Sequence, residues 1–209
     1  MDVKQAYNSW SGQYDSNNNK TRDLEAIALR AMLSEINFTS CLEIGCGTGK
    51  NTEWLLTKAN TITAVDLSEN MLAKAREKIK SDKVQFIQAD MLQPWAFASQ
   101  QYDLISFSLV LEHIEDLNAI FAKAATVLNS GGYIYVGELH PFKQYTGTKA
   151  RFETSEGLQI VDCFDHHVSD FALAAKQFGF VVESIIEYFD DDDRKSIPRI
   201  LALLFRKLP

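Results

Sequence analysis

This sequence of 209 residues has little of several features that would direct it to particular classes of protein. It contains only 3 cysteines and no CxxC pair, which argues against a disulfide scaffold and a cysteine-rich metal site. Basic residues are outnumbered 21 to 28, and the net charge of −7 predicts no nucleic-acid partner, since that affinity depends on lysine and arginine. The longest apolar run, Ile200 to Phe205, is far too short to span a bilayer. Because the polar start lacks the apolar core of a signal peptide, we expect a cytoplasmic protein.

What the sequence does contain is an alternation of apolar runs with stretches of helical spacing. The apolar runs predict strands at residues 41–44, 62–65, 84–87, 104–107 and 133–136. Helical spacing predicts helices at residues 22–36, 50–58, 69–79, 117–128 and 169–178, with residues 129–132 closing the fourth of them. This alternation predicts an α/β fold with a mostly parallel sheet covered on both faces. The last two apolar runs, 181–189 and 197–205, predict an antiparallel hairpin and therefore one reversed strand at the C-terminal end of the sheet.

A glycine-rich segment follows the first predicted strand. Gly45, Gly47 and Gly49 stand at alternate positions, where the ligands of open α/β sheets bind. Their spacing does not match the GxxxxGK[ST] pattern of a phosphate-binding loop or the GxGxxG pattern of a dinucleotide site. It favours a flatter turn against which adenosine and an amino-acid tail can lie. Glu43, just upstream, is a candidate acceptor for an ammonium group.

Two carboxylates follow the second and third predicted strands. Asp66 is placed to accept both hydroxyls of a ribose, and Asp90 to accept from the exocyclic amine of an adenine. Met71 and Met91 are candidates to sandwich the base, or else to pack the core. The placement of Asp66 is shared with NAD-dependent oxidoreductases, so these residues alone leave that alternative open.

Five segments in order resemble the motifs of the class I S-adenosylmethionine-dependent methyltransferases: LEIGCGTG, VDLSENML, QADM, YDLISFSLVLEHIED and LNSGGYIYVGELHP. The segment YNSWSGQYD is similar to the lid of the small-molecule branch, of the methyltransferase type 11/12 kind. No NPPY-like tetrapeptide of the nucleic-acid branch follows the fourth strand. The resemblance implies a Rossmann-like sheet of seven strands, S-adenosyl-L-methionine as cofactor, and in-line transfer of a methyl group to a small molecule. We expect no metal, because the sequence shows no ligand cluster.

The resemblance also implies roles for individual residues. The implied cofactor contacts are Glu43, Gly45, Cys46 and Gly47 at the methionine part, Asp66 and Leu67 at the ribose, Asp90 and Met91 at the adenine, Leu109 below the sulfonium, and Tyr14 from the lid. His113 and His140 follow the fourth and fifth predicted strands at the carboxyl edge of the sheet. They are the candidate general bases, which are needed only if the acceptor is a poor acid.

We expect one domain in four parts: residues 1–36 as lid and first helix, 37–139 as cofactor-binding core, 140–168 as a substrate-side insertion, and 169–209 as the C-terminal helix and hairpin. The long insertion suggests a functional segment. Aromatic residues there and in the lid favour an aromatic or apolar acceptor: Trp10, Tyr14, Phe142, Tyr145, Phe152 and Phe164. Two alternatives remain, a non-catalytic regulatory module that binds S-adenosylmethionine and a methyltransferase with a protein or tRNA acceptor.

Overall fold

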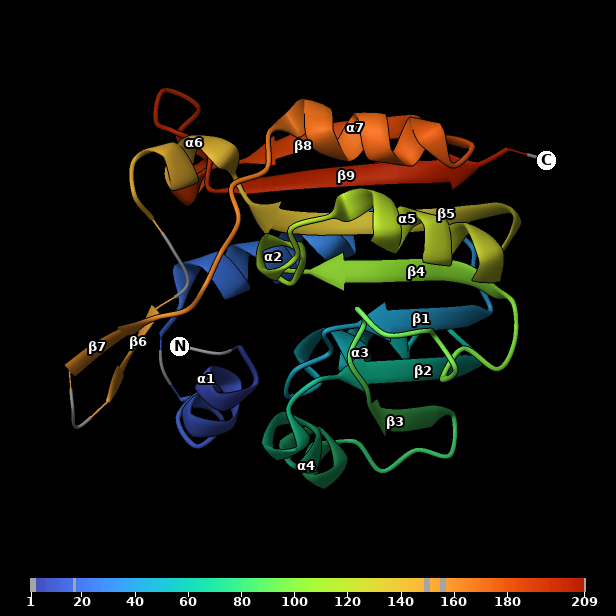
Figure 1. Cartoon of the computed structure of the whole chain (residues 1–209), viewed down its shortest axis with the longest axis horizontal. Coiled ribbons are helices and arrows are strands. Elements are labelled where there is room, and N and C mark those ends of the chain that lie inside the picture. The colour runs from blue at the N-terminus through green and yellow to red at the C-terminus, as the bar shows by residue number, and fades with distance from the viewer. Residues whose placement is uncertain (1–2, 17, 149–150, 155–156, 209) are drawn as a thin grey trace.

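The computed structural model describes residues 3–16, 18–148, 151–154 and 157–208, with the side chains at 151–154 and 158–160 left out. Its centre is a sheet of seven strands in the order β3-β2-β1-β4-β5-β9-β8 (Figure 1). The strands are β1 Ser40–Ile44, β2 Thr61–Asp66, β3 Val84–Gln88, β4 Tyr102–Ser108, β5 Leu128–Leu139, β8 Phe180–Tyr188 and β9 Ile200–Lys207. The first five strands are parallel, whereas β9 runs antiparallel to both β5 and β8. The predicted Rossmann-like sheet with its reversed strand is therefore confirmed.

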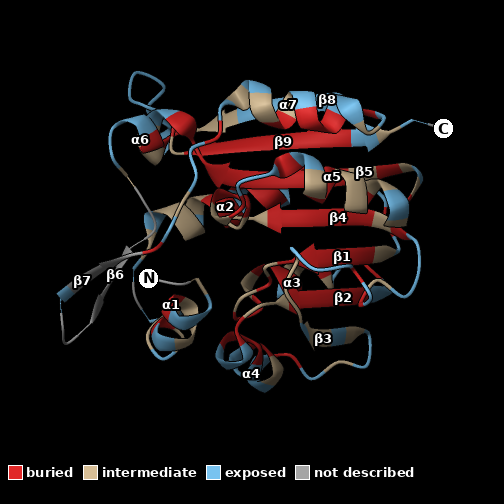
Figure 2. Cartoon of the chain, viewed as in Figure 1, coloured by how far each residue is buried: buried red, intermediate tan, exposed pale blue. Residues whose placement is uncertain are grey.

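Helices cover both faces of this sheet. The main ones are α2 Lys20–Leu33, α3 Lys50–Leu55, α4 Glu69–Lys78, α5 Leu117–Val127 and α7 Val168–Gln177. Apolar residues of α5 and α7 pack on one face, and those of α2, α3 and α4 pack on the other. The inner strands β1, β2, β4 and β9 and the second half of β5 are almost entirely buried, whereas the edge strands β3 and β8 are partly exposed (Figure 2). The five predicted helices are present, each ending within three residues of its predicted bounds.

The prediction that residues 129–132 close the fourth helix was wrong. The α5 helix ends at Val127, and β5 begins at Leu128, which pairs with Tyr102 of β4. The pairing then shifts before Tyr133 meets Leu104, and Gly131 lies between them with φ of 77°. The glycines therefore bend the start of a long strand, because a strand irregularity also needs a residue that tolerates positive φ.

The smaller elements gather beyond the carboxyl ends of the parallel strands (Figure 1). They are α1 Val3–Trp10, α6 Pro141–Tyr145, the hairpin of β6 Arg151–Thr154 and β7 Gly157–Ile160, and the short helices η1 Leu111–His113 and η2 Asp190–Asp192. The strand order reverses between β1 and β4, which is where open α/β sheets form a ligand crevice. In the part of the chain that the structure describes, no helix has the length and apolarity to cross a membrane.

Candidate functional site

The glycine loop after β1 is packed at both ends and open in the middle. All three glycines have positive φ, at 76° for Gly45, 55° for Gly47 and 81° for Gly49. A Cβ atom on Gly45 would lie 2.7 Å from Cγ2 of Val110, and one on Gly49 would lie 2.9 Å from Cδ1 of Ile79. A Cβ on Gly47 would meet nothing within 4 Å. Two glycines thus hold the loop against its neighbours, and the third leaves the backbone accessible to a ligand.

Asp66, at the end of β2, connects this loop to the next strand. Its Oδ2 accepts a hydrogen bond from the Gly47 amide, and its Oδ1 accepts one from the Ser68 amide, both at 2.8 Å. Burial raises the pKa of this carboxyl to about 6. Each oxygen keeps a further lone pair. The carboxylate is therefore held in one orientation while it can still accept from a ligand.

A cavity of about 230 Å³ opens beside Asp66. Its lining includes most of the predicted site residues, which come from four strand ends and the lid: Tyr14, Gly45, Gly47, Asp66, Leu67, Asp90, Met91, Leu109 and His113. A smaller cavity of about 50 Å³ continues past the loop and is lined by Glu43 and Cys46. The structure thus brings together ten of the eleven predicted cofactor residues along one connected path, since Gly45, Gly47, Tyr14 and Leu109 line both cavities.

Glu43 is buried beneath the glycine loop. Its Oε2 accepts from the Thr52 hydroxyl at 2.5 Å, and the residue is only 4% exposed. Burial raises the pKa of the carboxyl to about 8, and the nearby Glu25 and Asp66 add to this effect. A cationic ligand group in the small cavity would offset the free-energy cost of ionising this buried carboxyl group.

The segment from α1 to Tyr14 covers the cavity as a lid. Its rings pack on one another, with centroids 5.8 Å apart for Tyr7 and Trp10 and 4.9 Å apart for Trp10 and Tyr14. Polar contacts attach its far side, where Asp15 accepts from Thr48 at 2.6 Å and from Lys78 at 2.8 Å. The lid is therefore tied to both the glycine loop and α4.

His113 anchors the lid from the opposite side. Its Nδ1 lies 2.9 Å from the carbonyl oxygen of Asp162, and its Nε2 lies 2.9 Å from the Tyr7 hydroxyl. Because a carbonyl can only accept, Nδ1 carries the proton and Nε2 accepts from Tyr7. Burial lowers the pKa of the ring, which favours this neutral form. In this arrangement both nitrogens of His113 are engaged, so the ring positions the lid.

We expect Tyr7→Phe to loosen the lid. Loss of the hydroxyl leaves Nε2 of His113 without its donor, which costs about 1 kcal/mol. Amide hydrogen exchange in α1 should therefore accelerate roughly fivefold. Tyr145→Phe is the matched control, because it removes another tyrosine–histidine hydrogen bond, with His167, on the exposed surface. Equal exchange of α1 in the two variants would contradict this role of Tyr7.

Three expectations do not agree with the structure. Met71 is fully buried beside Ala6 and Trp10 and lines none of the described cavities, because it packs α4 against the lid. His140 is also fully buried: Nδ1 accepts from the Phe142 amide, and Nε2 lies 3.0 Å from Glu187. His140 thus caps the N-terminus of α6 and, like Met71, is not accessible to a ligand. Of the expected aromatic wall, Trp10 and Tyr14 line a second cavity that adjoins the first, whereas Phe142, Tyr145 and Phe164 line neither of these two cavities and are 51%, 52% and 38% exposed; Phe152 lies outside the described side chains.

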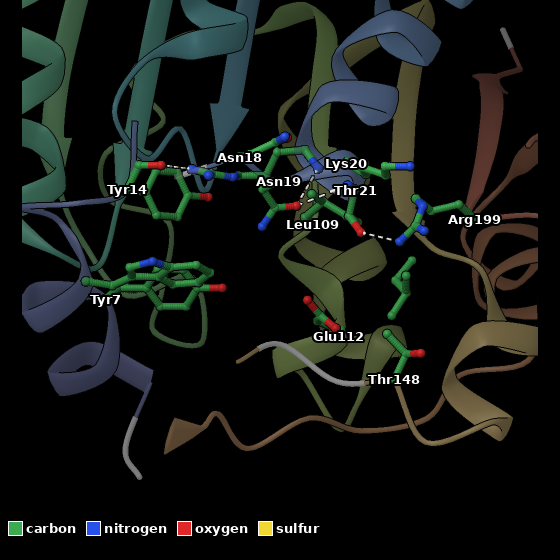
Figure 3. A pocket seen from close by; sticks show the side chains of 13 residues that line it. Tyr7, Tyr14, Asn18, Asn19, Lys20, Thr21, Leu109, Glu112, Thr148 and Arg199 are labelled. Atoms are coloured by element: carbon green, nitrogen blue, oxygen red, sulfur yellow. Dashed lines mark hydrogen bonds between the residues drawn. The ribbon is translucent and has the colours of Figure 1, made fainter. Parts of the chain in front are cut away.

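A second cavity of about 280 Å³ adjoins the first, and the sequence alone did not indicate most of its lining. Tyr7, Tyr14 and Leu109 line both cavities. Figure 3 shows Glu112 pointing into this space and Arg199 on its far side. Arg199 donates to both oxygens of Asp190, at 2.5 and 2.6 Å, and to the Thr21 hydroxyl at 3.2 Å.

Leu109 occupies the point where the cavities meet. It has φ of 53°, in the left-handed region that residues other than glycine rarely adopt. Its amide donates to the Gly137 carbonyl at 2.8 Å, which holds the backbone in this state.

Among the described residues no group of three or more histidine, cysteine or acidic side chains could hold a metal ion. The site is thus two larger cavities that adjoin beneath one aromatic roof, with a small third cavity past the glycine loop.

This arrangement agrees with the comparison to known proteins, in which residues 42–136 match the family described as "Methyltransferase domain". These residues are therefore similar to that family, over somewhat less than half of the chain. Nodulation protein S of Sinorhizobium fredii is 37% identical over 94 residues, which are 44% of this chain and 42% of the relative, so the chain spans less than half of it. The uncharacterized methyltransferase AN0656 of Emericella nidulans is 25% identical over 246 residues, covering 98% of this chain and 84% of that protein.

A solved methyltransferase structure has a similar fold. The N-methyltransferase NodS from Bradyrhizobium japonicum, solved in complex with S-adenosyl-L-homocysteine, superposes with a TM-score of 0.73 over 99% of each chain. Its sequence identity is 17%, so the similarity concerns the fold.

Proposed function

We propose that this chain binds S-adenosyl-L-methionine in the cavity beside Asp66 and transfers its methyl group to a small molecule in the adjoining cavity. The observation that carries the proposal is the shared wall, since Tyr7, Tyr14 and Leu109 line both spaces. Two ligands would therefore meet beside Leu109. The adjoining volume of about 280 Å³ suits a small acceptor.

The residues around the first cavity and the small cavity past the glycine loop fit each part of that cofactor. Asp66 would accept the ribose hydroxyls, with Leu67 beside it. Asp90 and Met91 would contact the adenine. Gly45, Gly47 and Cys46 would line the methionine part, and Glu43 would pair with its ammonium. We infer this fit from the accessible backbone at Gly47 and from the raised pKa of Glu43, which a cationic partner would lower.

When bound, S-adenosylmethionine supplies both the activated methyl group and the leaving group. The chain's own residues then have to bind, align and exclude water. Asp66 and the glycine loop would fix the cofactor, while Tyr7, Trp10 and Tyr14 would cover it. No catalytic triad is needed for such an in-line displacement.

We further propose that the chain works as one domain in the cytoplasm. Residues 1–36 would supply the lid, 37–139 the cofactor site, 140–168 part of the acceptor side, and 169–209 the completed sheet. Arg199 directly precedes β9 and lines the second cavity, so residues 169–209 also reach the proposed acceptor site.

Titration calorimetry tests the proposal directly. We expect S-adenosylhomocysteine to bind with a micromolar dissociation constant and NADH not to bind, because the glycine spacing does not suit a dinucleotide. Binding of NADH without binding of S-adenosylhomocysteine would overturn the proposed function. Binding of S-adenosylhomocysteine without methylation of any compound would instead favour a regulatory module.

A further inference from the structure

Glu112 is a buried acidic side chain that faces the second cavity without a full set of partners. Its side chain is 7% exposed, and it lies in η1, directly after β4. Its Oε2 has no hydrogen-bond partner among the described residues. Figure 3 shows the carboxyl group directed into the cavity. A buried acceptor without a donor is costly, so this oxygen is placed to receive a donor from a ligand.

The groups that face Glu112 do not neutralise it. Glu138, from β5, accepts from the amides of Val110 and Leu111 through Oε1, at 2.9 and 2.7 Å. The proximity of Glu112 adds to the effect of burial in raising the pKa of Glu138, and burial raises the pKa of Glu112 itself. The nearby Cys163 thiol opposes this rise in the pKa of Glu112, and Nε2 of His113 lies 4.0 Å from Oε1 of Glu112. Tyr7, the remaining titratable group near it, is neutral, since burial raises the pKa of its hydroxyl.

The cations of the same cavity lie elsewhere. Arg199 is paired with Asp190, the guanidinium of Arg22 stacks over the Tyr14 ring at 4.0 Å, and Lys20 stands beside Thr21 at the start of α2. Among the described residues no lysine or arginine forms an ion pair with Glu112. The cavity thus has an uncompensated acidic end at Glu112 and a polar rim with Thr21 and Thr148 at the other side.

This arrangement distinguishes between classes of acceptor. A carboxylate or phosphate placed at Glu112 would meet a second acid and lack a donor. A hydroxyl could donate, but its proton is far too weakly acidic for a carboxyl group to remove. An ammonium group both donates and carries the opposite charge, and its pKa lies close enough to that of a buried carboxyl for the proton to move.

We propose that the acceptor is a small primary or secondary amine whose nitrogen lies against Glu112, and that Glu112 takes its proton before methyl transfer. This inference rests on the proposed function. The ammonium group gives one proton to the Glu112 carboxylate and becomes a neutral amine with a free electron pair. That pair forms the new N–C bond as the S–C bond breaks, the sulfonium becomes a neutral thioether, and the amine becomes a methylammonium. Glu112 returns its proton to water when the product leaves. The polar rim favours an amine with further hydroxyl or amide groups.

Matched probe compounds test this proposal in place of the natural acceptor. Each set shares one skeleton: 3-aminopropanol, 1,3-propanediol and 3-hydroxypropanoate, and likewise butylamine, 1-butanol and butanoate. Methyl transfer from labelled S-adenosylmethionine is measured, together with binding of each probe to the protein loaded with S-adenosylhomocysteine. We expect the amine of each set to be preferred about tenfold or more over its partners.

Glu112→Gln then tests the residue itself. It keeps the size of the side chain and removes its charge, so amine methylation should fall about a hundredfold or more while affinity for S-adenosylhomocysteine changes less than about twofold. Glu115→Gln is the matched control, since Glu115 is exposed and three residues away.

The outcomes separate the two proposals. Preference for the alcohol or the acid, equal methylation by wild type and Glu112→Gln, or no binding and no methylation of any amine would each overturn the amine assignment. The preference among probes needs only the wild-type protein, so it holds even if a variant does not fold. Failure of the wild-type protein to bind S-adenosylhomocysteine overturns the proposed function instead.

Discussion

Replacing Asp66 by alanine is expected to weaken binding of S-adenosylhomocysteine by roughly a hundredfold. The variant removes the acceptor proposed for both ribose hydroxyls, and hydrogen bonds to a charged group contribute about 1.5 to 3 kcal/mol each. It also frees the Gly47 amide, which now donates to Asp66 at 2.8 Å, so the glycine loop loses its attachment to β2. Calorimetry on the wild type and the variant at pH 7.5 measures the change.

The same carboxylate predicts a pH dependence of binding. Its pKa in the free protein is raised to about 6, and the ionised form is the better acceptor, so affinity should fall as pH decreases through 6. Asp82→Ala is the control, because Asp82 is exposed and the variant makes the same change of charge. Unchanged affinity in Asp66→Ala, with the fold intact by circular dichroism, would refute the ribose assignment.

The ligand-free protein should become less stable as pH rises from 5 to 8. Burial raises the pKa of Glu43 from 4.5 to about 8, so between these values the folded state holds a proton that the unfolded state has released. The free energy of unfolding therefore decreases with rising pH across this window. By pH 7 to 8, Glu43 alone lowers the free energy of unfolding by on the order of 3 kcal/mol, and the raised pKa values of Glu138, Glu112 and Asp66 act in the same direction. The lowered pKa values of His113 and His140 act in the opposite direction, but only below about pH 6.5.

Glu43→Gln isolates the contribution of this residue. A glutamine carbonyl can still accept from Thr52, but it does not ionise, so the variant should match the wild type at pH 5 and be more stable at pH 8 by roughly 2 to 3 kcal/mol. Urea unfolding at both pH values measures this difference. Glu53→Gln is the control on the exposed side of α3 and should have the same effect at both pH values. A variant that is equally or less stable at pH 8 would show that Glu43 is ionised in the folded protein.

The fold was largely predictable because it depends on patterns that lie close together in the sequence. Apolar runs and helical spacing indicated β1 to β5 and their helices, and the short loop between β8 and β9 indicated the reversed strand. Alternate glycines likewise predicted a loop with accessible backbone, as found at Gly47. All of these inferences rest on the spacing of apolar residues and glycines over short stretches of the sequence.

The acceptor side was less predictable because its contacts join distant parts of the chain. The hydrogen bond between Tyr7 and His113 spans 106 positions, and the one between Arg199 and Thr21 spans 178. Side-chain direction was also hidden. His140 and His113 both follow a strand, but Pro141 starts a helix directly after His140 and turns its ring into a cap. Glu112 stands in a motif that was recognised, yet only the structure shows which way its carboxyl group points.

Leu109 shows how this chain balances stability against selectivity. A leucine with φ of 53° costs about 1 kcal/mol relative to a glycine in the same conformation. Glycine would relax that backbone, but it would also remove the side chain that lies between the two cavities. Selection for a fixed boundary between two reactants would therefore keep leucine here, while selection for thermal stability alone would favour glycine. For protein engineering, position 109 is accordingly the place where a broader range of acceptors and a more relaxed backbone would be gained together, at the expense of discrimination.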